Sequence, residues 1–580
     1  MADKIIVLSP GNGERKFRIP YADVLNPAQL AAVQHRDGPL LVVAGAGSGK
    51  TRTLIYRVAR LIESGVPPPS ILLMTFTRRA SQEMLRRVEQ LLGERARGVA
   101  GGTFHSFANT VLRRFGQPIG LKPNFSILDR SDMEDLINLL RTRMSLAARD
   151  RRFPKKGALV EVISMARNKR RALSEEMEID FPHLLEHQAE IAALAEAYEK
   201  YKLERALLDY DDLLYRLAEL LEHHDSVRRR LAAAYRYIMI DEYQDTNLIQ
   251  AELVRRLGSE HKNVMAVGDD AQSIYSFRGA NFRNILDFPD LFPGARIIKL
   301  EENYRSVKGI LDIANEVISR ASEKYTKVLF TRRNGDFRPL LVRAHDEHMQ
   351  SRFVAQRILE LREEGLALEE IAVLFRSSFH SFDLELELQR CDIPFIKRGG
   401  FKFIETAHIK DVLAHLRIIA NPADAVSWLR ILMLIQGIGH RTAERLIEVV
   451  AYSDEPEKAL AAALAKNEQR SARGAQGGAR LMELLDELRT GDTRPAHKIG
   501  LVLEYYLPLM REAYPDDYPK RERDLEHFHT ITQRYRTIES MLADMALEPP
   551  NDSLGDVLAV DSDEGYVTLS TIHSAKGLEW

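Results

Sequence analysis

Short apolar runs that alternate with amphipathic stretches open the chain. The runs at residues 40–43, 71–75 and 99–103 are separated by segments whose apolar positions have helical spacing. This alternation is typical of a parallel sheet whose strands are connected by helices. From about residue 105 to 235 the chain is rich in Leu, Ala, Arg and Glu at helical spacing, with almost no strand signal. We therefore predict an α/β domain interrupted by a helical insertion.

Strand patterns return after the insertion. The apolar runs at residues 237–240 and 264–267 each precede acidic and turn-prone residues, so we expect the first sheet to resume there. A second α/β pattern begins near residue 296, with strands expected at residues 296–300, 339–343 and 371–375.

The last third of the chain is mainly helical. A long helical stretch follows Gly399 and Gly400, and an Ala/Gly-rich piece at residues 471–480 predicts a flexible loop within it. A strand is expected again at residues 566–571. Residues 577–580 have no tail composition, and a new strand–loop unit begins where the chain stops, so we expect a truncated chain.

Composition limits the class of protein. At 580 residues the chain is long enough for about four domains, which excludes a small binding module. A net charge of −2 gives no global positive field, so any site for a polyanion must be a local patch. The single cysteine, Cys391, excludes a disulfide framework and a cysteine-based zinc site. Residues 1–13 have no signal-peptide core, and no apolar run is long enough to span a bilayer, so we expect a cytoplasmic protein.

A glycine-rich segment directly follows the first predicted strand. Residues 44–51 read Ala-Gly-Ala-Gly-Ser-Gly-Lys-Thr and precede a helical pattern at residues 53–63. Glycines let backbone N–H groups face phosphate oxygens, and the helix N-terminus adds positive potential. Lys50 is predicted to reach the β- and γ-phosphates, and Thr51 to ligate Mg²⁺. Ala44 replaces the first glycine of the strict pattern, and a chance glycine turn is the alternative.

Two acids follow the predicted strand at residues 237–240. Asp241 is predicted to hold Mg²⁺, directly or through water. Glu242 is predicted to orient and deprotonate the water that attacks the γ-phosphate. Two acids after an apolar strand are also typical of a solvated strand end, and only the glycine-rich loop favours the catalytic interpretation.

A third cluster, residues 267–279, follows another predicted strand. Gln272 is a candidate sensor of the γ-phosphate, and Arg278 adds a guanidinium. Tyr275 and Phe277 offer flat faces for base stacking, which contributes about 1–3 kcal/mol per base. Core packing of the two aromatic rings is the alternative.

With these three clusters in this order, the chain resembles the UvrD/Rep/PcrA family of superfamily 1A DNA helicases over essentially all of its length. Six segments carry this resemblance. They are residues 25–29 for the family's Gln motif, 75–80 for motif Ia, 102–106 for motif Ib, 241–245 for motif II, 302–306 for motif IV and 571–579 for motif V.

The resemblance implies an α/β fold of two RecA-like P-loop NTPase lobes, each with a mainly helical inserted subdomain. The expected divisions are lobe 1A at residues 1–104 and 236–295, insertion 1B at 105–235, lobe 2A at 296–398 and 564–580, and accessory domain 2B at 399–563. The second part of lobe 2A, at 564–580, is expected to be incomplete.

The resemblance also assigns residues to the nucleotide. Gln29 is expected to hydrogen-bond adenine, Tyr304 to stack on it, Arg52 to lie near the nucleotide, and Glu579 to reach the ribose. Phosphate binding is expected of the loop residues Ala46, Gly47, Ser48, Gly49, Lys50 and Thr51. Arg305 is the expected γ-phosphate finger, because a planar guanidinium matches phosphoryl oxygens, and a surface arginine is the alternative.

On the DNA side, five residues fall on family positions that touch single-stranded DNA: Phe76, His105, Tyr275, Phe277 and Arg278. Phe277 replaces the family's usual Trp, which puts unwinding efficiency in doubt rather than the mechanism. Gly437 and Gly439 lie in a segment that resembles the family's Gly-Ile-Gly hairpin, which grips duplex phosphates. A simple helix–helix turn is the alternative there.

The implied activity is ATP-dependent and Mg²⁺-dependent 3′-to-5′ movement on single-stranded DNA with duplex unwinding, in DNA repair or replication restart. The expected partners are single-stranded DNA and single-strand/duplex junctions. Repair proteins are candidate partners, and a monomer and a DNA-induced dimer both stay open. The family's motif VI has no counterpart before Trp580. This absence leaves one alternative open, a nucleotide- and DNA-binding module with impaired hydrolysis. A second alternative keeps the motor without strand separation, as a translocase that displaces proteins from single strands.

Overall fold

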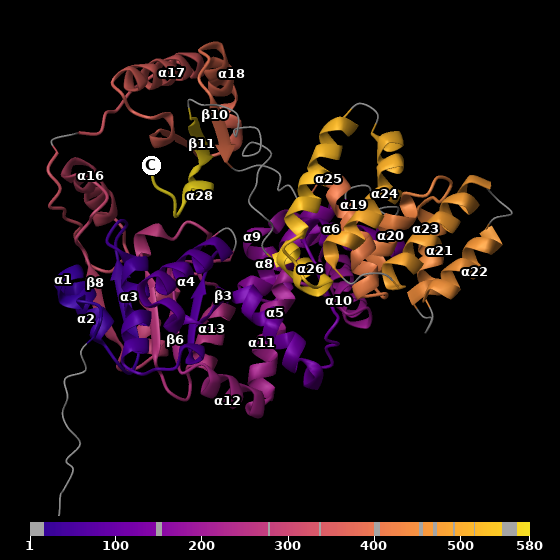
Figure 1. The fold of residues 1–580 in the computed structure, drawn as a ribbon, viewed down its shortest axis with the longest axis horizontal. Coiled ribbons are helices and arrows are strands. Elements are labelled where there is room, and N and C mark those ends of the chain that lie inside the picture. Colours follow the sequence, from indigo (N-terminus) through magenta and orange to yellow (C-terminus); the bar gives the residue numbers. More distant parts are fainter. Residues whose placement is uncertain are drawn as a thin grey trace, which may run out of the picture. The chain divides into compact units, whose positions relative to one another are not determined.

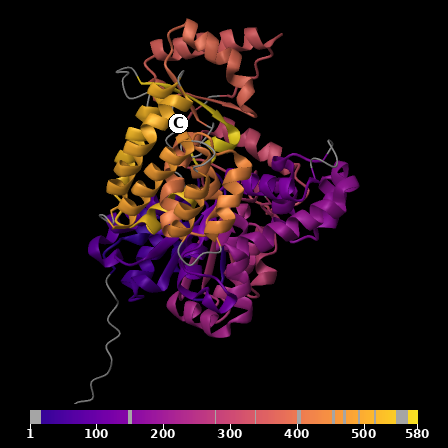
Figure 2. The same cartoon turned by 90° about the vertical axis from the view of Figure 1, so that its right-hand side faces the viewer.

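The fold is described from a computed structural model, which covers residues 17–146, 153–276, 279–335, 338–398, 406–451, 456–467, 472–490, 494–514, 517–547 and 565–580. The chain forms two compact units. The first unit is Met1–Phe104 with Leu221–Pro339, and the second is His105–Leu220 with Leu340–Trp580. Figure 1 follows the chain by colour, and Figure 2 shows the same ribbon turned by 90°.

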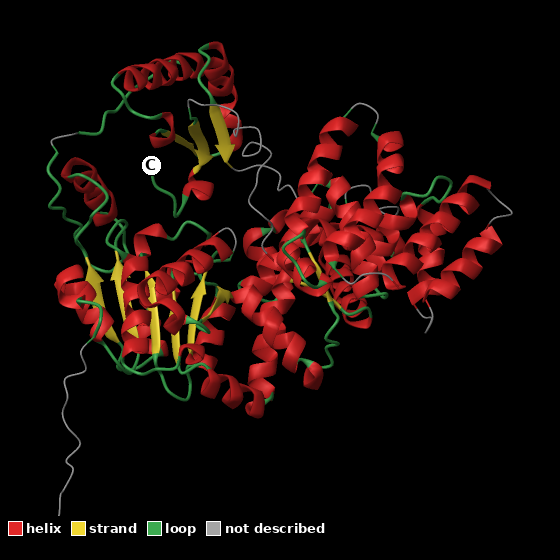
Figure 3. Cartoon of the chain, in the orientation of Figure 1, coloured by secondary structure: helices red, strands yellow, loops and turns green. Residues whose placement is uncertain are grey.

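A six-stranded parallel sheet forms the core of the first unit (Figure 3). The strand order is β3-β2-β6-β7-β1-β8, and every neighbouring pair is parallel. The strands are β1 (Leu40–Ala44), β2 (Ile71–Thr75), β3 (Ala100–Thr103), β6 (Tyr237–Ile240), β7 (Val264–Gly268) and β8 (Arg296–Leu300). Strands β1, β2, β6 and β7 are buried along their whole length, which explains their continuous apolar sequences. The predicted sheet that resumes after an insertion is confirmed.

Helices cover both faces of this sheet. The helices described in the first unit are α1 (Tyr21–Val24), α2 (Pro27–Gln34), α3 (Lys50–Glu63), α4 (Arg78–Leu92), α12 (Asp225–Ala234), α13 (Leu248–Leu257), α14 (Arg283–Leu286), α15 (Phe288–Leu291) and α16 (Lys308–Ser319). The chain steps one way along the sheet from β1 through β2 to β3, and the other way from β6 through β7 to β8. Because parallel crossovers are right-handed, α3 and α4 cover one face and α13 covers the other.

Local sequence explains why α4 forms where it does. Thr77 precedes the helix, and its Oγ1 accepts a hydrogen bond from the backbone N–H of Ala80 at 3.2 Å. Such a cap satisfies one of the N–H groups that a helix start leaves unpaired. Met84, Val88 and Leu92 are buried and recur every four residues, so one stripe of the helix packs on the sheet.

Strand β8 departs from the prediction. We predicted residues 296–300 as the first strand of the second α/β pattern, but β8 pairs with β1 at the edge of the first sheet, with Leu40 opposite Arg296. Only Ile298 and Leu300 of its five residues are buried. The local pattern predicts a strand correctly, but the choice of sheet depends on a partner more than 250 residues away in sequence, at residues 40–44.

The second unit contains a three-stranded parallel sheet of order β10-β11-β9. Its strands are β9 (Ala372–Phe375), β10 (Phe395–Arg398) and β11 (Val567–Thr571), and its helices are α17 (Glu347–Glu363), α18 (Phe382–Arg390) and α28 (Ile572–Ala575). The expected strands near residues 371–375 and 566–571 are confirmed. The strand expected at residues 339–343 is wrong, because these residues form no strand and Leu340 and Leu341 are 82% and 83% exposed.

The rest of the second unit is mainly helical. The elements before residue 224 are α5 (Phe104–Phe115), β4 (Ser126–Leu128), α6 (Arg130–Arg143), α8 (Lys156–Asn168), α9 (Leu173–Asp180), α10 (Gln188–Glu204), β5 (Leu207–Asp209) and α11 (Tyr210–His223). The later ones are α19 (Ala407–Ala420), α20 (Ala425–Met433), α21 (His440–Ala451), α22 (Pro456–Asn467), α23 (Ala472–Thr490), α24 (Pro495–Ala513), α25 (Tyr518–Thr532) and α26 (Ile538–Leu547). Strands β4 and β5 form a short parallel pair that the sequence pattern did not reveal. Gly399 and Gly400 lie outside the described residues.

The loop predicted at residues 471–480 is wrong from Ala472 onward, because helix α23 begins there. Alanine is the best helix former, and each interior glycine costs a helix only about 1 kcal/mol. Packing favours glycine at one of these positions, since a Cβ on Gly477 would lie 2.7 Å from Cγ2 of Ile435. Within the described residues, no helix is long and apolar enough to cross a membrane.

Candidate nucleotide and DNA site

The three predicted chemical clusters follow neighbouring strands of the first sheet. The glycine-rich loop follows β1, the acidic pair follows β6, and the third cluster follows β7. These strands are adjacent and parallel in the order β6-β7-β1, so their carboxyl ends meet at one edge of the sheet. This edge is where α/β sheets bind ligands.

The glycine-rich loop needs glycine at two positions. Gly47 and Gly49 have φ angles of +68° and +83°, in the left-handed region where other residues are strained. A Cβ on Gly47 would lie 2.7 Å from Cβ of Arg305, and one on Gly49 would lie 2.7 Å from Nε2 of Gln29. The loop therefore folds tightly and lies against both predicted ligand-binding side chains.

The loop is also fixed from within. Ser48 is fully buried, and its Oγ donates a hydrogen bond to the Gly45 carbonyl at 2.7 Å. Helix α3 begins at Lys50, so Thr51 occupies its first turn. The N–H groups of this turn lack helical partners and attract anions. The loop and the helix start together fit the phosphates of a nucleotide.

The Lys50 side chain points to the ends of the neighbouring strands. Its Nζ lies 3.2 Å from Oε1 of Glu242 and donates to Oε1 of Gln272 at 3.5 Å. Burial lowers the pKa of Lys50, but the carboxylates of Glu242, Asp269 and Asp241 outweigh burial and leave this pKa raised. Lys50 therefore stays charged, which suits its predicted role as a γ-phosphate ligand.

The acidic pair has an unusual backbone. Glu242 has a φ of 52°, uncommon for a residue with a side chain and a form of strain found at functional sites. Its backbone N–H donates to Oδ1 of Asp241 at 3.0 Å, and the N–H of Asp241 donates to the Met74 carbonyl at 2.9 Å. Burial, followed by the charge of Glu242, raises the pKa of Asp241 to about 7. A cation beside Asp241 would stabilise its charged form, which suits a metal ligand.

Gln244 links the acidic pair to the third cluster. Its Nε2 donates to Oε2 of Glu242 at 2.5 Å, and its Oε1 accepts from the N–H of Asp269 at 2.9 Å. Asp269 in turn accepts from Nε2 of Gln272 at 2.7 Å through Oδ2. The motif at residues 241–245 includes Gln244 but predicts no role for it, because its partners Glu242 and Asp269 follow different strands, β6 and β7.

The segment after β8 lies on the phosphate loop. The N–H of Tyr304 donates to the Gly47 carbonyl at 2.9 Å, and Nδ2 of Asn303 donates to the Ala46 carbonyl at 2.6 Å. Oδ1 of Asn303 accepts from the N–H of Arg305 at 2.9 Å. Asn303 is 2% exposed and orders both the loop and the predicted finger, a role that the sequence pattern does not reveal.

The predicted adenine-side residues surround the start of α2. Nε2 of Gln29 donates to the Ser48 carbonyl at 3.0 Å, while its Oε1 accepts from the N–H of Asn26 at 3.2 Å. The Tyr304 hydroxyl accepts from Nδ2 of Asn26 at 2.9 Å, and its ring is 48% exposed. The structure thus brings Gln29 and Tyr304 next to the loop, and their contacts with adenine stay a prediction.

Arg52 lies in the first turn of α3. Its Nη2 donates to the Val24 carbonyl at 2.8 Å, and its guanidinium lies 5.3 Å from the Tyr56 ring centre. Arg52 is therefore near the phosphate loop in sequence but is held by the end of α1.

Two predicted DNA-contacting aromatics form a pair at the same edge of the sheet. The rings of Phe76, after β2, and Tyr275, after β7, stack with centres 5.1 Å apart and an angle of 15° between planes. Phe76 is 37% exposed, so the pair offers an aromatic surface to solvent. Phe277 and Arg278 lie outside the described residues.

The remaining predicted residues belong to the second unit. The His105 ring packs edge-on against Tyr210 with centres 5.9 Å apart, and burial lowers the pKa of His105 to about 4. His105 is therefore neutral at pH 7. Gly437, with a φ of +90°, and Gly439, which has open space where a Cβ would stand, connect α20 to α21. Glu579 is exposed and follows α28.

Comparison with known proteins agrees with this geometry. Residues 25–293 match the UvrD/REP helicase N-terminal domain, and residues 298–580 match the UvrD-like helicase C-terminal domain. The ATP-dependent DNA helicase PcrA of Staphylococcus epidermidis is 33% identical over 574 residues, which cover 96% of this chain and 76% of the relative. The PcrA helicase of Bacillus subtilis strain 168 is 34% identical over 576 residues, with the same coverage. That of Leuconostoc citreum is 32% identical over 573 residues, with coverages of 96% and 75%. A phosphate loop, an acidic pair and a glutamine at one sheet edge, together with these matches, show that the chain belongs to the UvrD/Rep family of helicases.

Proposed function

We propose that this ATP-dependent DNA helicase uses Mg²⁺ and couples ATP hydrolysis to 3′-to-5′ movement on single-stranded DNA and duplex unwinding. Its role is in DNA repair or replication restart in the cytoplasm. One observation carries the proposal: the side-chain oxygens of Glu242 and Gln272 both lie within 3.5 Å of the Lys50 ammonium, next to the phosphate loop. A γ-phosphate bound there meets a cation, a base and an amide at once.

Each residue at the edge has a distinct chemical task. Lys50 neutralises the β- and γ-phosphate oxygens, and Glu242 accepts the proton of the attacking water. Thr51 and Asp241 would hold Mg²⁺, whose charge offsets that of the phosphates. Arg305 is the proposed ligand of the transition-state charge, and the attachment of its backbone to the loop through Asn303 supports this role.

The aromatic pair supplies the link to DNA. Tyr275 lies three residues after Gln272, so a change of Gln272 on hydrolysis is transmitted directly to a stacking surface shared with Phe76. Single-stranded DNA then moves as the aromatic grip alternates with the nucleotide state. We further propose that His105, Phe277 and Arg278 contact single-stranded DNA, and that Gly437 and Gly439 contact duplex phosphates through backbone N–H groups.

The decisive experiment measures ATP turnover with and without single-stranded DNA, beside a nucleotide-binding titration. We expect DNA to stimulate turnover, Lys50→Ala to lose nucleotide affinity, and Glu242→Gln to keep binding while turnover falls about 10²–10⁴-fold. Lys308→Ala, whose side chain is 76% exposed on α16, is the control and keeps the parent rate. Nucleotide binding without turnover in the presence of DNA contradicts the proposal.

Polarity is tested on the same preparation. Duplexes with a 3′ or a 5′ single-stranded tail are compared at saturating ATP. Unwinding of the 3′-tailed duplex is expected, and faster unwinding of the 5′-tailed duplex contradicts the assigned direction.

A further inference from the structure

One buried lysine of the first unit has no part in the chemistry described so far. Lys327 lies after α16, and its side chain is only 4% exposed. Its Nζ lies 2.5 Å from Oδ1 of Asp269 and also contacts Oδ1 of Asp270. The side chains of both aspartates are 3% exposed. A buried ammonium between two buried carboxylates is costly to assemble and strongly destabilising to break.

The two aspartates lie at the start of the third cluster. Oδ2 of Asp269 accepts from Nε2 of Gln272 at 2.7 Å, and the Oε1 of the same amide faces Lys50 at 3.5 Å. Asp269 therefore holds the amide of Gln272 with its oxygen toward Lys50. Lys327 fixes Asp269 from the other side, through Oδ1.

The segment that carries Lys327 is itself tied to the nucleotide edge. The N–H of Tyr325 donates to Oδ2 of Asp270 at 2.9 Å. The N–H of Asn303 donates to the Phe330 carbonyl at 2.7 Å, and Leu329 fills the space beside Gly45, where a Cβ would lie 2.1 Å from its Cδ2. We call residues 325–330 the strap. It joins three parts of the site: the third cluster, the phosphate loop and the segment of Arg305.

We propose that Lys327 is a positioning residue for ATP hydrolysis, which holds Gln272 in place through Asp269 and connects it, through the strap, to the phosphate loop and the Arg305 segment. This inference rests on the proposed hydrolysis of ATP at this edge. Lys327 does not touch the nucleotide itself, since its ammonium is enclosed by the two carboxylates. Its removal frees the Gln272 amide to turn, and turnover then suffers more than nucleotide binding does.

The test compares Lys327→Met, Lys327→Arg and the exposed control Lys308→Met on the full chain. Four quantities are measured: melting temperature, Kd for ATP in the absence of DNA, and kcat and KM for ATP hydrolysis with saturating single-stranded DNA. For Lys327→Met we expect kcat to fall at least tenfold while Kd and KM change less than threefold. Lys327→Arg keeps the positive charge and should recover kcat to within about threefold of the parent. Lys308→Met should match the parent.

Two results would overturn the proposal: parent-like kcat in Lys327→Met, or a loss of nucleotide affinity as large as the loss of kcat. If Lys327→Met does not fold, Asp270→Asn decides, because it removes one carboxylate partner of Lys327 and leaves the Asp269–Gln272 hydrogen bond. A kcat at least threefold lower in folded Asp270→Asn supports the proposal, and an unchanged kcat overturns it. A parent protein without DNA-stimulated turnover would instead refute the proposed function.

Discussion

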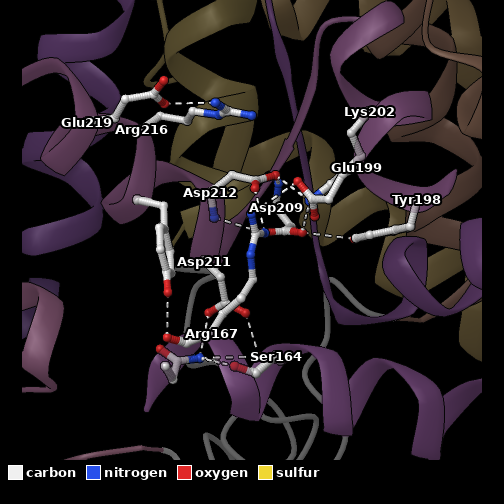
Figure 4. A network of polar contacts seen from close by, with 12 residues as sticks. Ser164, Arg167, Tyr198, Glu199, Lys202, Asp209, Asp211, Asp212, Arg216 and Glu219 are labelled. Atoms are coloured by element: carbon white, nitrogen blue, oxygen red, sulfur yellow. Dashed lines mark hydrogen bonds and ion pairs between the residues drawn. The ribbon is translucent and has the colours of Figure 1, made fainter. Parts of the chain in front are cut away.

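Removal of the Lys202 charge is expected to destabilise the helical part of the second unit between residues 105 and 220. Lys202, on α10, is 1% exposed, and its Nζ lies 2.5 Å from Asp209, 2.6 Å from Asp212 and 2.9 Å from Glu199. Figure 4 shows Tyr198 and Lys202 converging on Asp209. The three carboxylates are close enough to share one cation, and the Lys202 ammonium fills that place. Lys202→Met keeps an unbranched side chain, one atom shorter, and removes the charge.

The size of the destabilisation depends on the contacts that Asp209 and Asp212 keep in the variant. Removing one partner of a buried ion pair costs about 3–5 kcal/mol. Arg167 still contacts Oδ1 of Asp212 at 2.7 Å, and the Tyr198 hydroxyl still donates to Asp209 at 2.9 Å. We therefore expect the lower end, about 3 kcal/mol. Burial raises the pKa of Asp212, but Lys202 and Arg167 outweigh burial and hold this pKa below its usual value. Without Lys202 the carboxyl binds a proton more readily, so the loss should shrink as the pH falls toward the usual pKa of an aspartate, about 4.

Hydrogen exchange of peptides from α10 and β5 measures this loss locally, which suits a chain of several domains. A loss of about 3 kcal/mol in opening free energy corresponds to exchange roughly 10²-fold faster. Lys200→Met is the matched control, because Lys200 lies exposed on the same helix. It should change the opening free energy by less than about 0.5 kcal/mol. Equal exchange in Lys202→Met and Lys200→Met would refute the reasoning.

Three further predictions concern the loop, the DNA surface and the half-buried Asp211. Gly47→Ala should raise the Kd for ATP at least tenfold, since its Cβ would meet Arg305. The control Gly38→Ala, at a φ of +92° with open space around it, should cost only about 1–2 kcal/mol of stability. Equal ATP affinities of the two variants would contradict this prediction. Phe76→Ala should weaken single-stranded DNA binding about 5- to 150-fold in an anisotropy titration, whereas the exposed Phe379→Ala should not. Burial, followed by the charge of Asp209, raises the pKa of Asp211 to about 6, so the folded protein holds this proton more tightly and loses stability as the pH rises from about 4 to 6. Asp211→Asn should remove that loss, and parallel unfolding curves against pH would argue against it.

The sequence alone determined the buried strands of the first sheet and the position of the glycine-rich loop. The apolar runs of β1, β2, β6 and β7 are continuous because these strands are buried on both faces. The glycines of the phosphate loop can be recognised from the sequence, because a left-handed backbone at Gly47 and Gly49 restricts the residue type at those two positions. Such constraints act within a few residues, so a local pattern records them.

Only the tertiary structure decided the contacts between residues that are far apart in the sequence. Which sheet receives β8 depends on β1, and residues 472–480 are helical where local glycine content predicted a loop. The contact of Asn303 with the Ala46 carbonyl joins residues 257 positions apart, and that of Lys327 with Asp269 joins residues 58 apart. Buried polar groups need hydrogen-bond partners, but the chain contains several side chains of the right chemical type for each group. Only the folded chain selects among them, because it fixes which buried donors and acceptors come within hydrogen-bond distance.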